Sequence, residues 1–248
     1  MLFRSVLFNI EETELLQYPM NKETVEYSLP QNVITIAENA FYKTKYLQKI
    51  IINESLATIH ENNPFIYSES LTEFVIDSDN EKYSSQDGIL LNKEGTEIVC
   101  YPMNKIDKYY LIPETITTIS INAFTGNNHL ESIIIHDKVT TLKDKSISYM
   151  NSLKTVLFET KSASGFTCGS DPFISNDRLQ NITIRDDFEG EDLCYTEKSL
   201  NKTAGISIGE NVWYIFEEIS QHLLVYGNGQ IKDFNETDKN TWDGGHEE

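Results

Sequence analysis

The sequence is poor in positive charge and lacks long apolar runs. Its 248 residues contain 20 Lys and Arg against 39 Asp and Glu, which gives a formal net charge of −19 at pH 7. A field of this sign repels phosphate backbones and anionic lipid headgroups, so nucleic acids and membrane surfaces are poor partners. No apolar run approaches the ~20 residues that a membrane-spanning helix needs, so the sequence predicts no membrane insertion.

Cysteine is also scarce, with three residues that lie far apart and form no C-x-x-C pair for zinc or redox chemistry. We interpret them as buried small side chains or free thiols. The alternative is a disulfide between Cys168 and Cys194, which would need an oxidising compartment. The first residues of the chain contain no apolar segment long enough for a secretory signal. The sequence therefore indicates either a protein that is not exported by that route or a fragment of a longer chain.

The motifs of enzymes and of metal sites are missing as well. The five histidines show no H-x-x-x-H or H-E-x-x-H spacing, and there is no G-x-S-x-G motif. The G-N-G run at 227–229 lacks the helix signal that follows a phosphate-binding loop. Residues 77–81 resemble the start of a calcium loop, but Lys82 replaces the glycine that such a loop needs. We therefore predict a non-catalytic protein without a metal or cofactor, and a solvated loop at 77–81.

What the sequence does contain is material for a core and an internal duplication. Apolar residues make up 39% of the chain, which is enough for a folded protein. Residues 6–21 (VLFNIEETELLQYPMN) align without a gap on residues 89–104 (ILLNKEGTEIVCYPMN), at an offset of 83. The same offset places residues 28–41 on residues 111–124. Chance does not give so long a match, so the chain holds two copies of one segment.

A shorter repeat lies within each copy. The pattern L-x-x-φ-x-φ, in which φ is apolar, recurs every 23–26 residues, with one gap of 59. A period of about 20–29 residues with this pattern is the signature of leucine-rich repeats. Each unit supplies one short strand that can bury its apolar side chains only against neighbouring coils, so the strands form a parallel sheet along a solenoid. The units begin at Leu47, Leu71, Leu130, Leu153 and Leu179.

The 59-residue gap contains a predicted β-hairpin. Its strands are expected at residues 89–91 and 98–101, and the turn between them contains Gly95, which supplies the positive φ that such turns need. The first copy starts with the same hairpin, at residues 6–8 and 15–18. We therefore predict a β-rich leucine-rich repeat solenoid with a parallel sheet and inserted β-hairpins.

Several of these motifs occur together in one known family. The motif N-x-x-Y-x-S-x-D-G-φ-L (residues 80–90), the motif G-T-x-φ-φ-x-Y-P (residues 95–102) and the leucine repeats make residues 5–185 similar to the BspA-like leucine-rich repeat surface proteins. Members of that family are typically surface antigens or adhesins that bind host proteins or other cells and have no enzymatic activity. The resemblance implies the same properties for this chain.

The C-terminal segment is similar to an accessory β-hairpin motif of the same family. We therefore predict a repeat solenoid over residues 1–187, an acidic linker over 188–204, and a small β-hairpin module with a tail over 205–248. The positions that match the accessory motif are Trp213, Leu224, Gly227, Gly229, Asp233, Phe234 and Trp242.

The outward positions of the predicted strands carry candidate protein-binding residues. Four of these positions are apolar, and strands ~4.8 Å apart would join them into one exposed stripe, with the hairpin looping out and leaving the stack unbroken. Alternatively, these positions carry such residues only because β-branched side chains favour strands, or a loop covers them. The acidic surroundings favour a basic partner. The stripe consists of Ile51, Val75, Ile134 and Leu157, and the polar residues beside it are Asn53, Asp77, His136 and Glu159.

The resemblance and the missing catalytic motifs lead to one functional prediction. We expect a non-catalytic protein-binding repeat protein, at the cell surface or secreted, that acts as an antigen or adhesin and attaches to host proteins or other cells. The alternative is a cytoplasmic leucine-rich repeat scaffold for protein–protein interaction. The two functions differ only in location.

Overall fold

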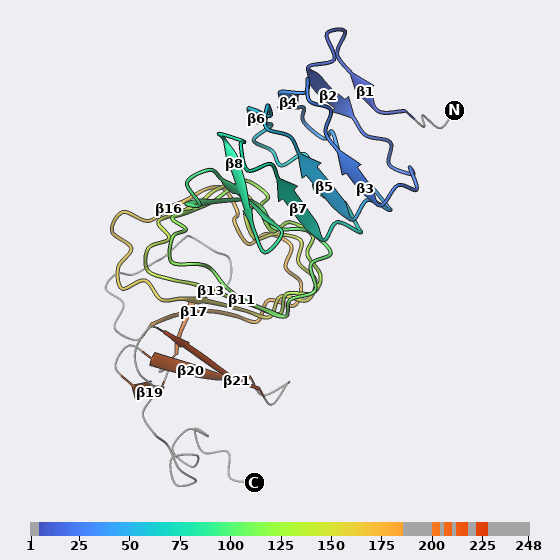
Figure 1. Ribbon diagram of the computed structural model, residues 1–248. Helices are drawn as coiled ribbons and strands as arrows, with labels where there is room; N and C mark the ends of the chain where they lie inside the picture. Colours follow the sequence, from blue (N-terminus) through green and yellow to red (C-terminus); the bar gives the residue numbers. More distant parts are fainter. Residues whose placement is uncertain (1–4, 186–199, 204–205, 210–211, 218–221, 228–248) are drawn as a thin grey trace. The chain divides into compact units, whose positions relative to one another are not determined.

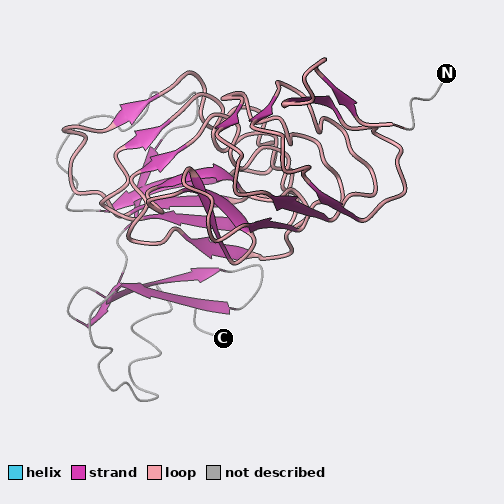
Figure 2. Ribbon diagram, turned by 45° about the horizontal axis from the view of Figure 1, so that its top comes forward, coloured by secondary structure: helices cyan, strands magenta, loops and turns pink. Residues whose placement is uncertain are grey.

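The computed structural model describes most of the chain, in residues 5–185, 200–203, 206–209, 212–217 and 222–227. All regular secondary structure in these residues is β-strand, as Figure 2 shows, which confirms the predicted β-rich class. The described residues include no helix of the length and hydrophobicity needed to cross a membrane.

The chain divides into two compact units. The first comprises residues 1–184 and 188–201, and the second comprises 185–187 and 202–248. The predicted linker over 188–204 remains a prediction, because residues 188–199 lie outside the described part of the chain.

The first unit is a solenoid in which each coil contributes one long and one short strand. Most inward residues of both strand types are apolar and buried, because a single coil cannot cover its own apolar face. The long strands at the leucine motifs are β5 (Lys49–Ile52), β7 (Glu73–Ile76), β13 (Ser132–Ile135), β15 (Thr155–Phe158) and β17 (Asn181–Arg185). The short strands are β4 (Thr35–Ile36), β6 (Thr58–Ile59), β12 (Thr118–Ile119), β14 (Thr141–Leu142) and β16 (Thr167–Cys168).

The long strands lie in two sheets, in which they pair in parallel with one another. One has the order β3-β5-β7, with β3 at Glu26–Ser28, and Figure 1 shows these strands side by side. The other has the order β11-β13-β15-β17-β18, with β11 at Tyr109–Leu111 and β18 at Leu200–Thr203. The expectation of an unbroken stack is therefore wrong, since β7 and β11 belong to different sheets.

The predicted hairpins join the short strands. The first short-strand sheet has the order β1-β2-β4-β6, and the second has the order β16-β14-β12-β10-β9-β8. Within each hairpin the strands are antiparallel, whereas β2 and β10 pair in parallel with the next coil. The added strands are β1 (Leu7–Phe8), β2 (Glu14–Gln17), β8 (Tyr83–Gln86), β9 (Ile89–Asn92) and β10 (Glu97–Cys100).

The turn between β8 and β9 interrupts the long-strand stack. The backbone N–H of Phe74 in β7 donates to the carbonyl of Gly88 at 2.9 Å, so this turn occupies the edge of β7. Gly88 has a φ of +76°, and a Cβ at this position would lie 2.8 Å from the Cβ of Glu73. Glycine is therefore required here both for the left-handed backbone and for the close approach to β7.

The hairpin also separates two hydrophobic cores. Leu90 and Cys100 pack into the core of the first copy, whereas Ile89 and Leu91 pack into the core of the second. A strand that is buried on both faces needs a continuous apolar run, and β9 has one. Burial raises the pKa of the Cys100 thiol to about 12. Cys100 is a free cysteine, and the alternative pairing of Cys168 with Cys194 involves a residue outside the described part of the chain.

Several bends place an aromatic ring between coils. Phe41 stacks on Tyr18 and on Phe65, in both cases with ring centroids 5.4 Å apart. In the second copy Phe124 stacks on Tyr101 with the centroids 4.9 Å apart. The Ala-Phe motif thus supplies a filler between coils.

Buried asparagines hold the corners of the coils. The Asn127 side chain donates to the carbonyls of Pro102 (3.1 Å) and Lys105 (3.0 Å), and it accepts from the backbone N–H groups of His129 and Leu130. These bonds satisfy backbone groups that the turning chain leaves unpaired.

In the second unit β20 (Val212–Glu217) and β21 (His222–Gly227) are antiparallel, and β19 (Ile206–Gly209) pairs with β20. These strands contain the matched positions Trp213, Leu224 and Gly227. The other accessory-motif positions, Gly229, Asp233, Phe234 and Trp242, lie outside the described residues.

Candidate protein-binding face

The outward positions of the long strands lie in the expected register. Ile51 in β5 is the Cα partner of Val75 in β7, and Ile134 in β13 is the Cα partner of Leu157 in β15. None of these four side chains belongs to either core cluster. The structure thus brings them together in two pairs, one on each long-strand sheet.

The two pairs differ in exposure. Val75 is 39% exposed and Ile51 is half-buried, but Ile134 and Leu157 are only 3% and 2% exposed. The prediction that Ile134 and Leu157 contact water is therefore wrong. A side chain that points away from its own coil reaches water only if nothing else covers that face, and sequence spacing does not report this. The burial agrees with the alternative in which part of the face is covered.

The exposed face contains one apolar residue that the sequence analysis missed. Leu111 in β11 is the Cα partner of Ile134 and is 51% exposed. The duplication could have found it, because Leu111 aligns with Ser28, the partner of Ile51 in the first copy. The exposed apolar positions are therefore Val75 and Leu111, and we call these two residues together with the half-buried Ile51 the exposed column.

The β8–β9 turn lies between the two parts of the exposed column. Its backbone contacts β7 through Gly88, and the charge of Asp87 also acts on Tyr110 of β11. Burial, followed by this charge, raises the pKa of the Tyr110 hydroxyl. The column is thus two apolar segments with a polar turn between them.

Asn53 and His136 were predicted as exposed polar residues beside the apolar stripe, but both are buried and support the fold. Both are 4% exposed. The Asn53 amide donates to the carbonyls of Pro30 and Val33 and accepts from the backbone N–H of Leu56 at 2.7 Å. The expectation that Asn53 faces outward is wrong because this side chain satisfies backbone groups of the preceding coil.

The same explanation holds for His136. Its Nε2 lies 2.7 Å from the carbonyl of Pro113, and its Nδ1 accepts from the backbone N–H of Lys138 at 3.0 Å. Pro113 is the counterpart of Pro30, so His136 replaces Asn53 in the second copy. Neither residue is available to a partner.

Asp77 and Glu159 lie nearer the surface. Asp77 is exposed, and its carboxylate accepts from the backbone N–H of Asp79 at 3.0 Å. Oxygens of Glu54, Asp77 and Asp79 lie within 4.8 Å of one another, and all three residues are exposed. Glu159 is half-buried and its backbone N–H donates to Ile135 at 2.8 Å. Asp77 therefore remains a candidate polar binding residue beside the exposed column.

Charged rows lie along both long-strand sheets. On the first, the Nζ of Lys49 is 2.8 Å from Glu73 and 3.8 Å from Glu26. The hydrogen bond to Glu73 is the main cause of the raised pKa of Lys49. On the second, Glu131 pairs with Lys154 and, at 3.7 Å, with Lys108, and these partners lower the pKa of Glu131. The apolar positions thus lie beside polar groups, as in a protein-binding surface.

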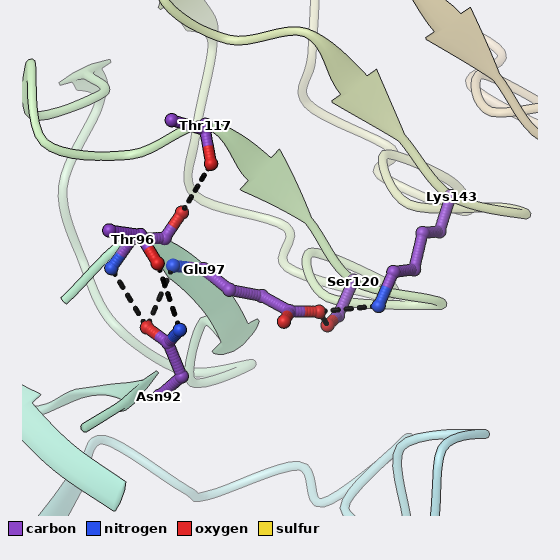
Figure 3. Close-up of polar contacts among 6 residues, drawn as sticks. All are labelled: Asn92, Thr96, Glu97, Thr117, Ser120 and Lys143. Atoms are coloured by element: carbon purple, nitrogen blue, oxygen red, sulfur yellow. Dashed lines mark hydrogen bonds and ion pairs between the residues drawn. The ribbon is translucent and has the colours of Figure 1, made fainter. Parts of the chain in front are cut away.

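The short-strand face of the second copy carries a further polar network (Figure 3). The carboxylate of Glu97 accepts hydrogen bonds from the Ser120 hydroxyl and from the Lys143 ammonium. Below it, Asn92 accepts from the backbone N–H groups of Thr96 and Glu97 at 2.8 and 2.9 Å. One oxygen of Glu97 in β10 thus joins the residues that directly follow β12 and β14, so the network ties three neighbouring short strands together.

These observations define a leucine-rich repeat solenoid. More specifically, the chain belongs to the family described as BspA type leucine rich repeat region, which matches residues 19–88 and 99–219 with six copies. Proteins of this fold are typically non-catalytic. No curated protein matches the chain.

Three solved structures are similar to this chain. A leucine-rich repeat protein from Eubacterium ventriosum is 22% identical over 65% of this chain and 48% of its own, with a TM-score of 0.54, which shows the common fold. The pneumococcal vaccine antigen PcpA is 17% identical over 73% of this chain and 62% of its own (TM-score 0.43). A leucine rich cell surface protein from Faecalibacterium prausnitzii is 18% identical over 66% and 54% (TM-score 0.46). The chain therefore spans about half of the length of these proteins.

Proposed function

We propose that this chain is a protein-binding module of a cell-surface or secreted antigen or adhesin, and that it attaches to host proteins or other cells. Membership in the BspA-type family supports a surface role. The observation that carries the binding role is the exposed column, where Val75 and Leu111 present apolar side chains to water beside charged rows. An exposed apolar position with a polar surround favours a protein partner.

The column also favours a class of partner. The chain carries a net charge of −19, and Asp77 lies exposed two residues after Val75. A basic protein is attracted to such a surface, and electrostatic attraction mainly raises the rate of association. Binding should therefore weaken as salt is added.

Substitution of the exposed column tests this proposal. We expect Val75→Asp and Leu111→Asp to leave the thermal melt unchanged but to reduce partner capture at least ~10-fold, because a carboxylate replaces the apolar contact. The matched control is Ile106→Asp, since Ile106 is 75% exposed and lies outside the column. Capture from lysates of host cells, with identification by mass spectrometry, provides the readout. Equal capture by all three folded variants would contradict the proposal.

Location is tested separately on the full-length protein. Antibodies raised against this chain should label intact cells of the source organism as strongly as permeabilised cells. Labelling that requires permeabilisation would exclude the surface role and leave an intracellular scaffold.

A further inference from the structure

Three tyrosines and a lysine meet on the bends between the strands, outside the exposed column. The rings of Tyr42 and Tyr67 are edge to face with centroids 5.7 Å apart, and those of Tyr67 and Tyr149 are edge to face at 6.5 Å. The Nζ of Lys43 lies 5.1 Å from the centroid of the Tyr42 ring. Tyr149 is 37% exposed and the other two tyrosines are half-buried. We call these four residues the tyrosine cluster.

Packing does not account for the tyrosine cluster. None of its members belongs to either core. Tyr67 and Tyr149 have φ values of 59° and 54°, in the left-handed region that favours glycine, and Lys43 has a φ of 57°. Gly126 occupies the equivalent position of its bend, with a φ of 83°, so the fold accepts glycine there. Ser175 has a φ of 56° at the same position of a further bend, so the left-handed backbone belongs to the bend and does not require an aromatic ring.

The cluster presents hydrogen-bond donors beside aromatic surface. Burial is the main cause of the raised pKa of Tyr67, so its hydroxyl stays protonated at neutral pH. Lys43 adds an ammonium group, which is also a donor. Elsewhere in the chain the Tyr101 hydroxyl donates to the carboxylate of Asp107 at 2.7 Å, which shows the pairing that such donors make. An acceptor-rich, negatively charged partner would complement this surface.

The charge of the whole chain limits the size of that partner. A net charge of −19 repels extended polyanions, whereas the single charge of Lys43 can attract a carboxylate at short range. Tyrosine is enriched at the centres of protein interfaces, where its ring provides contact area and its hydroxyl a polar contact. A short acidic protein segment satisfies both conditions.

We propose that the tyrosine cluster is a second protein-binding surface, separate from the exposed column, which takes a short acidic segment of a partner protein. Carboxylates of the segment accept from Lys43 and the tyrosine hydroxyls, and its apolar side chains pack on the rings. This surface is independent of the exposed column, so each can fail without the other.

Selection from a random peptide library tests the proposal. Twelve-residue peptides displayed on phage are selected on the whole chain and on the Tyr67→Asn/Tyr149→Asn variant, in which asparagine tolerates the left-handed backbone. We expect the wild-type chain to enrich peptides rich in Asp and Glu and the variant not to enrich them. A synthetic enriched peptide should bind the variant at least ~10-fold more weakly, and Lys43→Asn should also weaken it. Ile106→Asn is the control for an exposed apolar residue outside the cluster.

A second peptide, with Asn and Gln in place of Asp and Glu, separates charge from shape. We expect it to bind at least ~10-fold more weakly than its acidic parent. Several results would overturn the proposal: no enrichment, enrichment of basic peptides, or equal binding by the folded double variant. Binding of acidic hyaluronan fragments in place of peptides, or loss of self-association as the only effect of the double variant, would do the same.

Discussion

The hairpins that open the two copies have the same internal hydrogen bonds but different surroundings. Asn9 accepts from the backbone N–H groups of Thr13 and Glu14 at 2.8 and 2.9 Å, and Asn92 makes the same two bonds in the second copy. However, Leu7 in β1 is 42% exposed, whereas its counterpart Leu90 is fully buried. The local network therefore sets the turn in both copies, and the neighbouring coil alone decides burial.

At aligned positions of the two copies, different polar side chains stand beside the same structural feature. In the second copy the Tyr101 hydroxyl donates to Asp107, but Thr24 stands at that position beside Tyr18. Asn53 and His136 support the same corner with an amide and an imidazole. At this corner the backbone carbonyls are thus satisfied by an amide in one copy and by an imidazole in the other.

The largest expected effect comes from matched changes in the two cores. Leu47 and Leu130 are fully buried counterparts, one in each core. Leu47→Asp and Leu130→Asp should each abolish cooperative unfolding, because an unpaired buried carboxylate costs several kcal/mol of the ~5–15 kcal/mol that stabilises a domain. Circular dichroism melts provide the measurement. A wild-type melt for either variant would show that its leucine does not pack inward.

An intermediate effect is expected where the copies use different chemistry. Asn53→Ala removes partners from two carbonyls and one N–H, so we expect a loss of about 3 kcal/mol in the free energy of unfolding. His136→Asn restores the chemistry of the first copy and should cost about 1 kcal/mol or less. Urea denaturation at neutral pH compares the two. Equal losses would mean that the histidine is not a replacement for the asparagine.

The smallest effect is expected at the network that only the second copy has. Lys143 pairs with Glu97, whereas His60 and Ala37 stand at the positions of Lys143 and Ser120 in the first copy. Because these side chains are partly exposed, Lys143→Met should cost at most ~1 kcal/mol, and less at high salt. Glu14→Gln, the matched change of the counterpart of Glu97, should leave the urea midpoint unchanged. A cost that does not depend on salt would argue against an ionic contribution.

The sequence predicted the features that repeat and missed those that depend on surroundings. The leucine period placed Leu47, Ile50 and Ile52 in the core, and all three are fully buried. The same spacing could not report that Ile134 is covered, because a strand pattern fixes the direction of a side chain and not what lies above it. The resemblance gave the family.

Two further misses have physical causes as well. The outward alternation suggested that Asn53 lies in water, but an amide at a corner can pair with the backbone groups that the bend leaves open. The break at Gly88 was missed because a turn that approaches a strand edge leaves no periodic signal in the sequence. In the sequence, Gly88 stands out only as part of the motif at residues 80–90, which does not show that it contacts β7.

The strand that is buried on both faces bears on how such a protein can change length in evolution. β9 closes the core of the first copy on one side and opens the core of the second on the other. A duplicated segment of this kind contains both the strand that separates the two cores and the coils that pack on that strand. Recombination that adds or removes a whole copy therefore also adds or removes the strand that closes its core.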